Sequence, residues 1–141
     1  MQYRVHCDGA SRGNPGESAA GVVIYDSYGA VTARISVRLG ILTNNQAEYR
    51  AVLAGMQLVE QLRPTEVEFR LDSQLTVQQL SGHWKIKNEV LRELSIQIHN
   101  AAPPDATVRY THVNRSENKL ADLLANWALD HTSSENVFPT D

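Results

Sequence analysis

The first turn of the chain is the stretch Cys7-Asp8-Gly9-Ala10-Ser11-Arg12-Gly13-Asn14-Pro15-Gly16. A short alternating run from Tyr3 precedes it and predicts a β-strand that delivers the carboxylate of Asp8 into a glycine-rich loop. Glycine permits close approaches that other residues forbid, so Asp8 is well placed to hold a metal ion or a phosphate-bearing substrate. The alternative is a β-turn in which Asp8 hydrogen-bonds the nearby backbone. This stretch alone does not decide between the two interpretations.

The composition is that of one ordinary globular domain. The chain has 141 residues, of which 42% are hydrophobic and 21% are charged, and its single cysteine excludes an internal disulfide framework. No apolar run approaches the ~18 residues that a membrane span needs, and the N-terminus shows no signal region. We therefore expect a cytoplasmic protein that has no membrane association and is a monomer.

The net charge of −3 argues against non-specific binding of nucleic acid through a broadly basic surface. This argument weakens if several acidic residues surround metal ions, because bound cations reverse the local sign of the charge.

Hydrophobic periodicity predicts an α/β fold with the element order βββαβα(α)βα. Three strands with short connections form an antiparallel meander, and a strand–helix–strand arrangement then makes the fourth strand parallel to a neighbour. The expected domain covers residues 1–131, and the polar residues 132–141 are predicted to be a disordered tail. The strands of this mixed five-stranded sheet are expected at residues 3–8, 20–25, 31–39, 66–72 and 107–113.

Capping signals locate the helices. Thr43 and Gln46 have the spacing of a capping box, and the helix that they begin ends before Pro64. A short helix is expected from residue 73 to 81, and Asn88 is a candidate cap for the next. The last helix follows the loop that ends at Asn118.

Four acidic residues occupy unexpected places. Asp8 and Asp72 each close a predicted strand, Glu48 lies at the edge of a buried helical stripe, and Asp122 interrupts the apolar face of the last helix. Each one alone has a simple structural explanation. Because sites form at the carboxyl ends of strands in open sheets, the four side chains are expected to meet at one edge.

Carboxylates gathered in a small volume repel one another unless cations neutralise them. All-oxygen surroundings suit hard divalent ions, so we expect Mg²⁺, with Mn²⁺ as a possible substitute. Two such ions make a clamp for in-line displacement at phosphorus by water, with no need for a serine or cysteine nucleophile. The residues therefore favour a two-metal phosphodiesterase with Asp8, Glu48, Asp72 and Asp122 as catalytic and metal-binding residues.

Four motifs resemble those of ribonuclease H, type 1, in that family's order and spacing, over about residues 1–130. They are residues 8–16 (DGASRGNPG), 43–48 (TNNQAE), 72–74 (DSQ) and 118–126 (NKLADLLAN). The resemblance implies the ribonuclease H fold, with strand order 3-2-1-4-5 and strand 2 antiparallel. It also implies that the chain is an endonuclease that hydrolyses the RNA strand of RNA–DNA hybrids, leaving 5′-phosphate and 3′-hydroxyl ends, in the removal of RNA primers and R-loops.

The resemblance also implies a set of substrate contacts. An enzyme that cuts only RNA must sense the 2′-hydroxyl, which amides and hydroxyls at a groove edge can do. Thr43 and Asn14 are candidates for a phosphate pocket, and Thr43 also caps a helix. Trp84 lies where the family touches the DNA backbone, although a core tryptophan beside solvated lysines is the alternative. The expected substrate-binding residues are Ser11, Asn14, Thr43, Asn44, Asn45, Gln74, Trp84, Lys85 and Lys87.

The chain departs from the family pattern in two places. His112 lies ten residues before Asp122, where many members carry a histidine that assists proton transfer or product release, but the following loop differs from theirs. His112 is therefore either a catalytic residue or an ordinary strand-end side chain. The chain also resembles the branch that lacks a basic protrusion after the tryptophan, since only Lys85 and Lys87 stand there, which predicts weaker binding of the hybrid.

Two other functions remain open at this point. One is a nucleic-acid-binding module that keeps the fold without the chemistry. The other is a different two-metal nuclease, acting on double-stranded RNA or as an exonuclease. The amide side chains favour recognition of the 2′-hydroxyl and argue against a DNA exonuclease.

Overall fold

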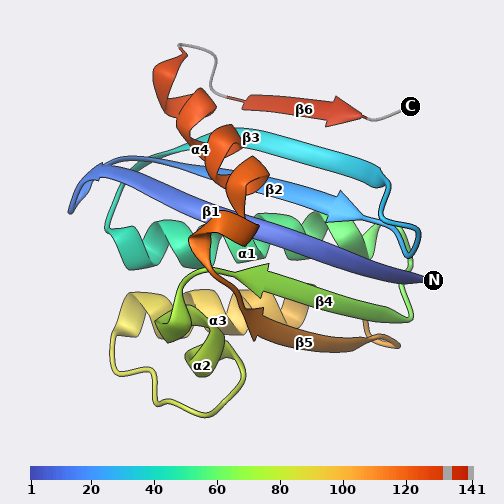
Figure 1. Ribbon diagram of the computed structural model, residues 1–141. Coiled ribbons are helices and arrows are strands. Elements are labelled where there is room, and N and C mark those ends of the chain that lie inside the picture. The colour runs from blue at the N-terminus through green and yellow to red at the C-terminus, as the bar shows by residue number, and fades with distance from the viewer. Residues whose placement is uncertain (132–134, 140–141) are drawn as a thin grey trace.

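The computed structural model describes residues 1–131 and, as backbone, residues 135–139. Within these residues one mixed sheet has the strand order β5-β4-β1-β2-β3-β6 (Figure 1). Its strands are β1 (Gln2–Gly13), β2 (Gly16–Tyr25), β3 (Val31–Leu42), β4 (Glu66–Leu71), β5 (Thr107–His112) and β6 (Glu135–Pro139). The helices are α1 (Asn44–Glu60), α2 (Gln74–Leu80), α3 (Glu89–Ala101) and α4 (Lys119–Asp130), and a 3₁₀ turn spans Arg115–Glu117.

The predicted strand order 3-2-1-4-5 is confirmed for β1 to β5. Strand β2 runs antiparallel to both β1 and β3, whereas β4 runs parallel to β1 and to β5. The α1 helix makes the crossover between β3 and β4, and α2 with α3 makes the crossover between β4 and β5. The central strand β1 therefore has an antiparallel neighbour on one side and a parallel neighbour on the other.

The first glycine-rich stretch is a long hairpin, where the sequence predicts a loop after a strand that ends at Asp8. Strand β1 continues to Gly13, and β2 pairs with it down to the pair Gly13 and Gly16. Gly13 has a φ of +110°, which an L side chain rarely adopts, so the tight turn needs glycine at this point. Asp8 consequently lies in the middle of a strand, and only Asp72 directly follows one.

The predicted disordered tail differs from the structure over residues 135–139. These residues form β6, which pairs antiparallel with β3 from Val37 with Glu135 to Ala33 with Pro139. Without β6, β3 would be an edge strand with a row of unpaired backbone groups. Residues 132–134 and 140–141 of the predicted tail lie outside the described residues.

Helices cover both faces of the sheet (Figure 1). The α1 and α3 helices lie on one face, and α4 crosses the other face over β1, β2 and β3. The main core lies under α1, where Val5, Cys7 and Phe69 are fully buried. Gly21 on β2 allows α4 to come close, since a Cβ atom there would lie 2.0 Å from the carbonyl oxygen of Ala121.

The predicted capping signals begin the helices as expected. Thr43 and Gln46 form a complete capping box at α1, and Asn88 caps α3 through the backbone N–H of Leu91. No helix in the described part of the chain is long and apolar enough to cross a membrane.

Candidate active site

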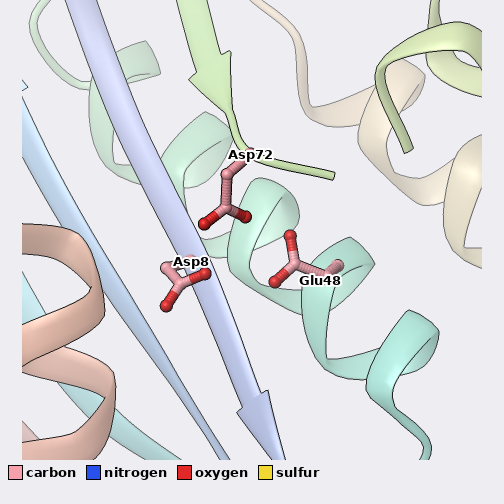
Figure 2. Close-up of side chains that lie close together, drawn as sticks. All are labelled: Asp8, Glu48 and Asp72. Carbon is pink, nitrogen blue, oxygen red and sulfur yellow. The ribbon is translucent and has the colours of Figure 1, made fainter. Parts of the chain in front are cut away.

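Three of the predicted carboxylates converge at one point of the sheet. Asp8, Glu48 and Asp72 each offer an oxygen atom, and these atoms all lie within 4.8 Å of one another. Figure 2 shows the three side chains pointing toward each other from β1, α1 and the end of β4. Oxygen ligands of one Mg²⁺ ion lie about 3–4 Å apart, so modest movement would bring this group onto a common cation.

The parallel register of β1 and β4 places Asp8 beside Asp72. The last paired residues are His6 and Arg70, and Asp8 and Asp72 each lie two residues further along their strands. Strand β4 ends at Leu71, whereas β1 continues to Gly13. Asp72 follows the end of β4, and its carboxyl lies beside that of Asp8 (Figure 2).

Glu48 reaches the site because α1 comes very close to β1. A Cβ atom on Gly9 would lie 2.3 Å from the carbonyl carbon of Ala47, so only glycine permits this approach. The backbone N–H of Gly9 donates to Oε1 of Glu48 at 2.8 Å. This bond fixes one Glu48 oxygen on β1 next to Asp8. The glycine that follows Asp8 therefore serves the contact with α1.

Asp122 approaches the group from the opposite face of the sheet. It lies in the first turn of α4, and its carboxyl interacts with that of Asp8. Asn126 donates its side-chain N–H to Oδ1 of Asp122 at 3.2 Å. Asp122 and Asn126 line the same cavity as the other three acids, but Asp122 is not part of the tight group of three.

Burial and mutual repulsion make the carboxylates hard to ionise. Asp8 is 5% exposed and Glu48 is 8% exposed. Burial, together with the charges of Glu48 and Asp72, raises the pKa of Asp8 to about 10. Burial likewise raises the pKa of Glu48 to about 8, against the hydrogen bond from Gly9, and it raises the pKa of Asp72. The site therefore favours either protons or cations.

Arg115 is a cation that the sequence interpretation did not select. It stands at the start of the 3₁₀ turn before α4 and lines the carboxylate cavity. Its positive charge lowers the pKa of Asp72 and of Glu48, which offsets part of the rise from burial. The sequence feature that could have identified Arg115 is its position as a basic residue in the loop just before the helix that carries Asp122.

His112 is the last residue of β5, and its side chain is exposed. It is not among the described residues that line the carboxylate cavity, although its charge also lowers the pKa of Asp72, as the smallest of the causes. A catalytic role for His112 stays a prediction.

Most of the predicted substrate-binding residues lie in a second cavity next to the acids. The hairpin tip reaches α1, where Oδ1 of Asn14 accepts the backbone N–H of Asn44 at 3.0 Å. The side chains that line this cavity are Asn14, Thr43, Asn44, Asn45, Leu75, Gln79, Lys85, Lys87, Asn88 and Leu91. Asn44 and Asn45 also line the carboxylate cavity, so the two cavities adjoin.

The remaining three candidates differ in their surroundings. Trp84 is 46% exposed, so the alternative of a core tryptophan is wrong. Gln74 is exposed as the first residue of α2. Ser11 lines the carboxylate cavity, but its hydroxyl donates to the carbonyl oxygens of Gly13 at 2.6 Å and Leu42 at 3.1 Å. Ser11 therefore joins the hairpin to the end of β3.

The chain is similar to known proteins over most of its length. The model of the family described as reverse transcriptase-like matches residues 6–128. The chain is 40% identical over 129 residues to ribonuclease HI of Halobacterium salinarum, covering 90% of this chain and 65% of that protein. It is 39% identical over 142 residues to a bifunctional protein of Mycobacterium tuberculosis, of which it covers only 39%.

Two solved structures share the fold at high similarity. The crystal structure of the Halobacterium salinarum RNase H1 has a TM-score of 0.89 and 38% identity, covering 92% of this chain and 98% of that one. The chain belongs to the ribonuclease H family, type 1. LC11-RNase H1, solved in complex with an RNA/DNA hybrid, has a TM-score of 0.86 and 34% identity, covering 91% of this chain and 96% of that one.

A buried chain of hydrogen bonds joins α4 to β1 in this ribonuclease H domain. Nε of Arg4 donates to Nε2 of His6 at 3.1 Å, so Nδ1 of the neutral ring carries the proton and donates to Oδ1 of Asn118 at 3.0 Å. Nδ2 of Asn118 then donates to the carbonyl oxygen of Cys7 at 2.8 Å. The backbone carbonyl of Asn118 accepts the N–H of Asp122. Asn118 thereby fixes the start of α4 relative to Asp8.

The donor set of the ribonuclease H site fits a hard divalent cation. The three grouped side chains offer only carboxylate oxygen, and two of them are buried. The burial and the raised pKa values of Asp8 and Glu48 mean that ionised carboxylates here need a compensating charge, which a bound cation would supply.

Proposed function

We propose that the chain is an endoribonuclease that hydrolyses the RNA strand of RNA–DNA hybrids. The observation that carries this proposal is the convergence of Asp8, Glu48 and Asp72 within 4.8 Å, beside a cavity lined by amides and two lysines. An all-carboxylate group suits phosphodiester chemistry through divalent ions and lacks the parts of a serine or cysteine nucleophile. The solved relative bound to an RNA/DNA hybrid supports the choice of duplex.

In this proposal Asp8, Glu48, Asp72 and Asp122 hold two Mg²⁺ ions, which Mn²⁺ can replace. When bound, these ions make water a stronger nucleophile toward phosphorus and stabilise the leaving oxygen. The resulting products carry 5′-phosphate and 3′-hydroxyl ends. Asp8 and Glu48 are buried, and the N–H of Gly9 fixes one oxygen of Glu48, so both side chains have restricted freedom.

Arg115 and His112 have distinct roles in the proposal. Arg115 lines the cavity and counters negative charge on Glu48 and Asp72, so we assign it to stabilising the charge that builds on the phosphate. His112 is exposed at the end of β5, where it can exchange protons with solvent as product leaves.

Recognition of the two strands is assigned to the two adjoining cavities. Asn44 and Asn45 line both, which supports assigning their amides to the 2′-hydroxyls of the RNA strand next to the acids. Asn14, Thr43, Lys85 and Lys87 line one cavity, and we assign their donors and charge to phosphates of the DNA strand. Trp84 is exposed and therefore accessible for packing against the backbone. Ser11 and Gln74 stay predicted contacts.

Broader roles stay predictions from the sequence. Removal of RNA primers and R-loops is the expected role of this activity, and a cytoplasmic monomer is the expected form. Sedimentation analysis of the purified protein would show the oligomeric state.

The proposal is tested by comparing cleavage of labelled RNA–DNA, RNA–RNA and DNA–DNA duplexes of one sequence in Mg²⁺. We expect cuts only in the RNA strand of the hybrid, and no product from the matched variant Asp72→Asn. Hybrid binding without cleavage, in Mg²⁺ or in Mn²⁺, would instead indicate a binding module. Equal cleavage of RNA–RNA would show that the enzyme does not require a DNA strand.

A further inference from the structure

The loop between α2 and α3, residues 81–88, has its backbone carbonyls held from two sides. Nε2 of Gln79 donates to the carbonyl oxygen of Lys85 at 3.2 Å. Nη2 of Arg92 donates to the carbonyl oxygens of Ile86 at 3.3 Å and Lys87 at 3.4 Å. Three consecutive carbonyls therefore face back to the helices, while the side chains of Lys85 and Lys87 line the substrate cavity.

Tyr49 sets the orientation of the Gln79 amide. The hydroxyl of Tyr49 donates to Oε1 of Gln79 at 2.5 Å, so the amide N–H group of Gln79 is the end that reaches Lys85. Tyr49 is fully buried in α1, so packing holds its ring in place beside Gln79. It follows Glu48 directly in the chain, so the same turn of α1 supports the carboxylate site and the lysine loop.

We propose that Tyr49, acting through Gln79, is a positioning residue that holds Lys85 and Lys87 for binding of the substrate backbone. This inference rests on the proposed hybrid-cleaving function and deepens it. A lysine on a loose loop loses conformational freedom when it binds a phosphate, whereas a lysine on a fixed backbone has less to lose. The chain has few basic residues at this position, so the fixed backbone compensates for a weak positive field.

The geometry predicts a separation between binding and chemistry. Removing the Tyr49 hydroxyl frees the Gln79 amide to rotate and releases the carbonyl of Lys85. Asp8, Glu48 and Asp72 keep their own contacts, and the net charge of the protein does not change. The substrate KM should therefore rise while kcat at saturating hybrid stays the same.

The test uses Tyr49→Phe, which keeps the buried ring, with Tyr110→Phe as the matched control. Tyr110 is a partly buried tyrosine on β5 that packs against Phe69. Hybrid cleavage is measured at several salt concentrations, in the wild-type background and in the Lys85→Ala/Lys87→Ala background. Gln79→Met is a second variant that breaks the same chain of bonds.

We expect Tyr49→Phe to raise KM by about three- to tenfold, the value of one or two hydrogen bonds, and to make the dependence of log KM on log salt shallower. In the double-alanine background the same change should alter KM by less than about twofold, because the lysines that it positions are gone. Gln79→Met should not add to Tyr49→Phe, and Tyr110→Phe should leave KM unchanged.

Three results would overturn the inference: an unchanged KM in Tyr49→Phe, an equal rise of KM in the double-alanine background, or a fall of kcat alone. Wild-type protein that fails to cleave the hybrid would instead overturn the proposed function, so the two failures are distinguishable.

Discussion

The replacement Asp8→Asn should stabilise the metal-free protein while it removes the metal site. Folding raises the pKa of Asp8 to about 10 and that of Glu48 to about 8, so both carboxyls hold protons more strongly in the folded state than in the unfolded chain. Their contribution to stability is fully present below the unfolded pKa near 4. It is lost as pH rises toward the folded pKa values.

The size of the effect follows from proton linkage. One extra proton on the folded state lowers the free energy of unfolding by about 1.4 kcal/mol for each pH unit of increase. Between pH 5 and pH 7 the largest loss for one group is thus about 3 kcal/mol. Neighbouring acids and water reduce the cost of ionising Asp8. We therefore expect Asp8→Asn to be more stable than wild type by roughly 1–3 kcal/mol at pH 8.

The assay is urea unfolding in a chelator from pH 5 to pH 9, followed by circular dichroism. Asp105→Asn, which makes the same exchange of a carboxyl oxygen for an amide nitrogen at an exposed acid, is the matched control and should follow wild type. The advantage of Asp8→Asn should grow with pH and shrink when excess Mg²⁺ is added, since the cation replaces the protons in wild type. A stability difference that does not vary with pH, or that Mg²⁺ does not alter, would refute the electrostatic account of the site.

Substitutions at four further positions test individual side chains of the site. Arg115→Ala should lower kcat by roughly 10- to 100-fold, and Arg115→Lys should recover part of that loss. His112→Ala should lower kcat by a smaller factor. Single-turnover kinetics measure both effects, and a larger loss in His112→Ala than in Arg115→Ala would contradict these roles. Asn118→Ala removes the bonds that join α4 to β1 and should cost roughly 2–4 kcal/mol in urea unfolding, and a loss below 1 kcal/mol would contradict the buried network. Gly9→Ala should lower both stability, by more than about 2 kcal/mol, and cleavage, because its Cβ would lie 2.3 Å from Ala47; a fully active variant with unchanged Tm would show that α1 can move away.

The meeting of Asp8 with Asp72 was predictable because it depends on short-range patterns. The alternation before Asp72 and the capping box at Thr43 each define an element within a few residues, and the crossover rule then places β4 parallel to β1. Once that register exists, Asp8 and Asp72 must meet. The placement of Asn44 and Asn45 followed as well, because both occupy the first turn of a helix whose start was already known.

The features that the sequence left undetermined depend on contacts between distant segments. Asp8 lies inside a strand because β2 pairs with β1 well beyond it, which the glycines concealed. In the sequence Gly9 and Gly21 look like residues that interrupt a strand. In the structure Gly9 lets the backbone of α1 approach one face of the sheet, and Gly21 lets the backbone of α4 approach the other face. Arg115 lines the carboxylate cavity because of the 3₁₀ turn in which it lies. Such a short turn has no hydrophobic periodicity that would reveal it in the sequence.

The most direct test of the central claim is cleavage of an RNA–DNA hybrid as a function of Mg²⁺ concentration, with the ends of the RNA products identified. Wild-type protein should need Mg²⁺ and should leave 5′-phosphate and 3′-hydroxyl ends, and Glu48→Gln and Asp72→Asn should yield no product while remaining folded. Cleavage by wild type in a chelator, or normal turnover by either variant, would contradict the claim that these carboxylates carry the chemistry.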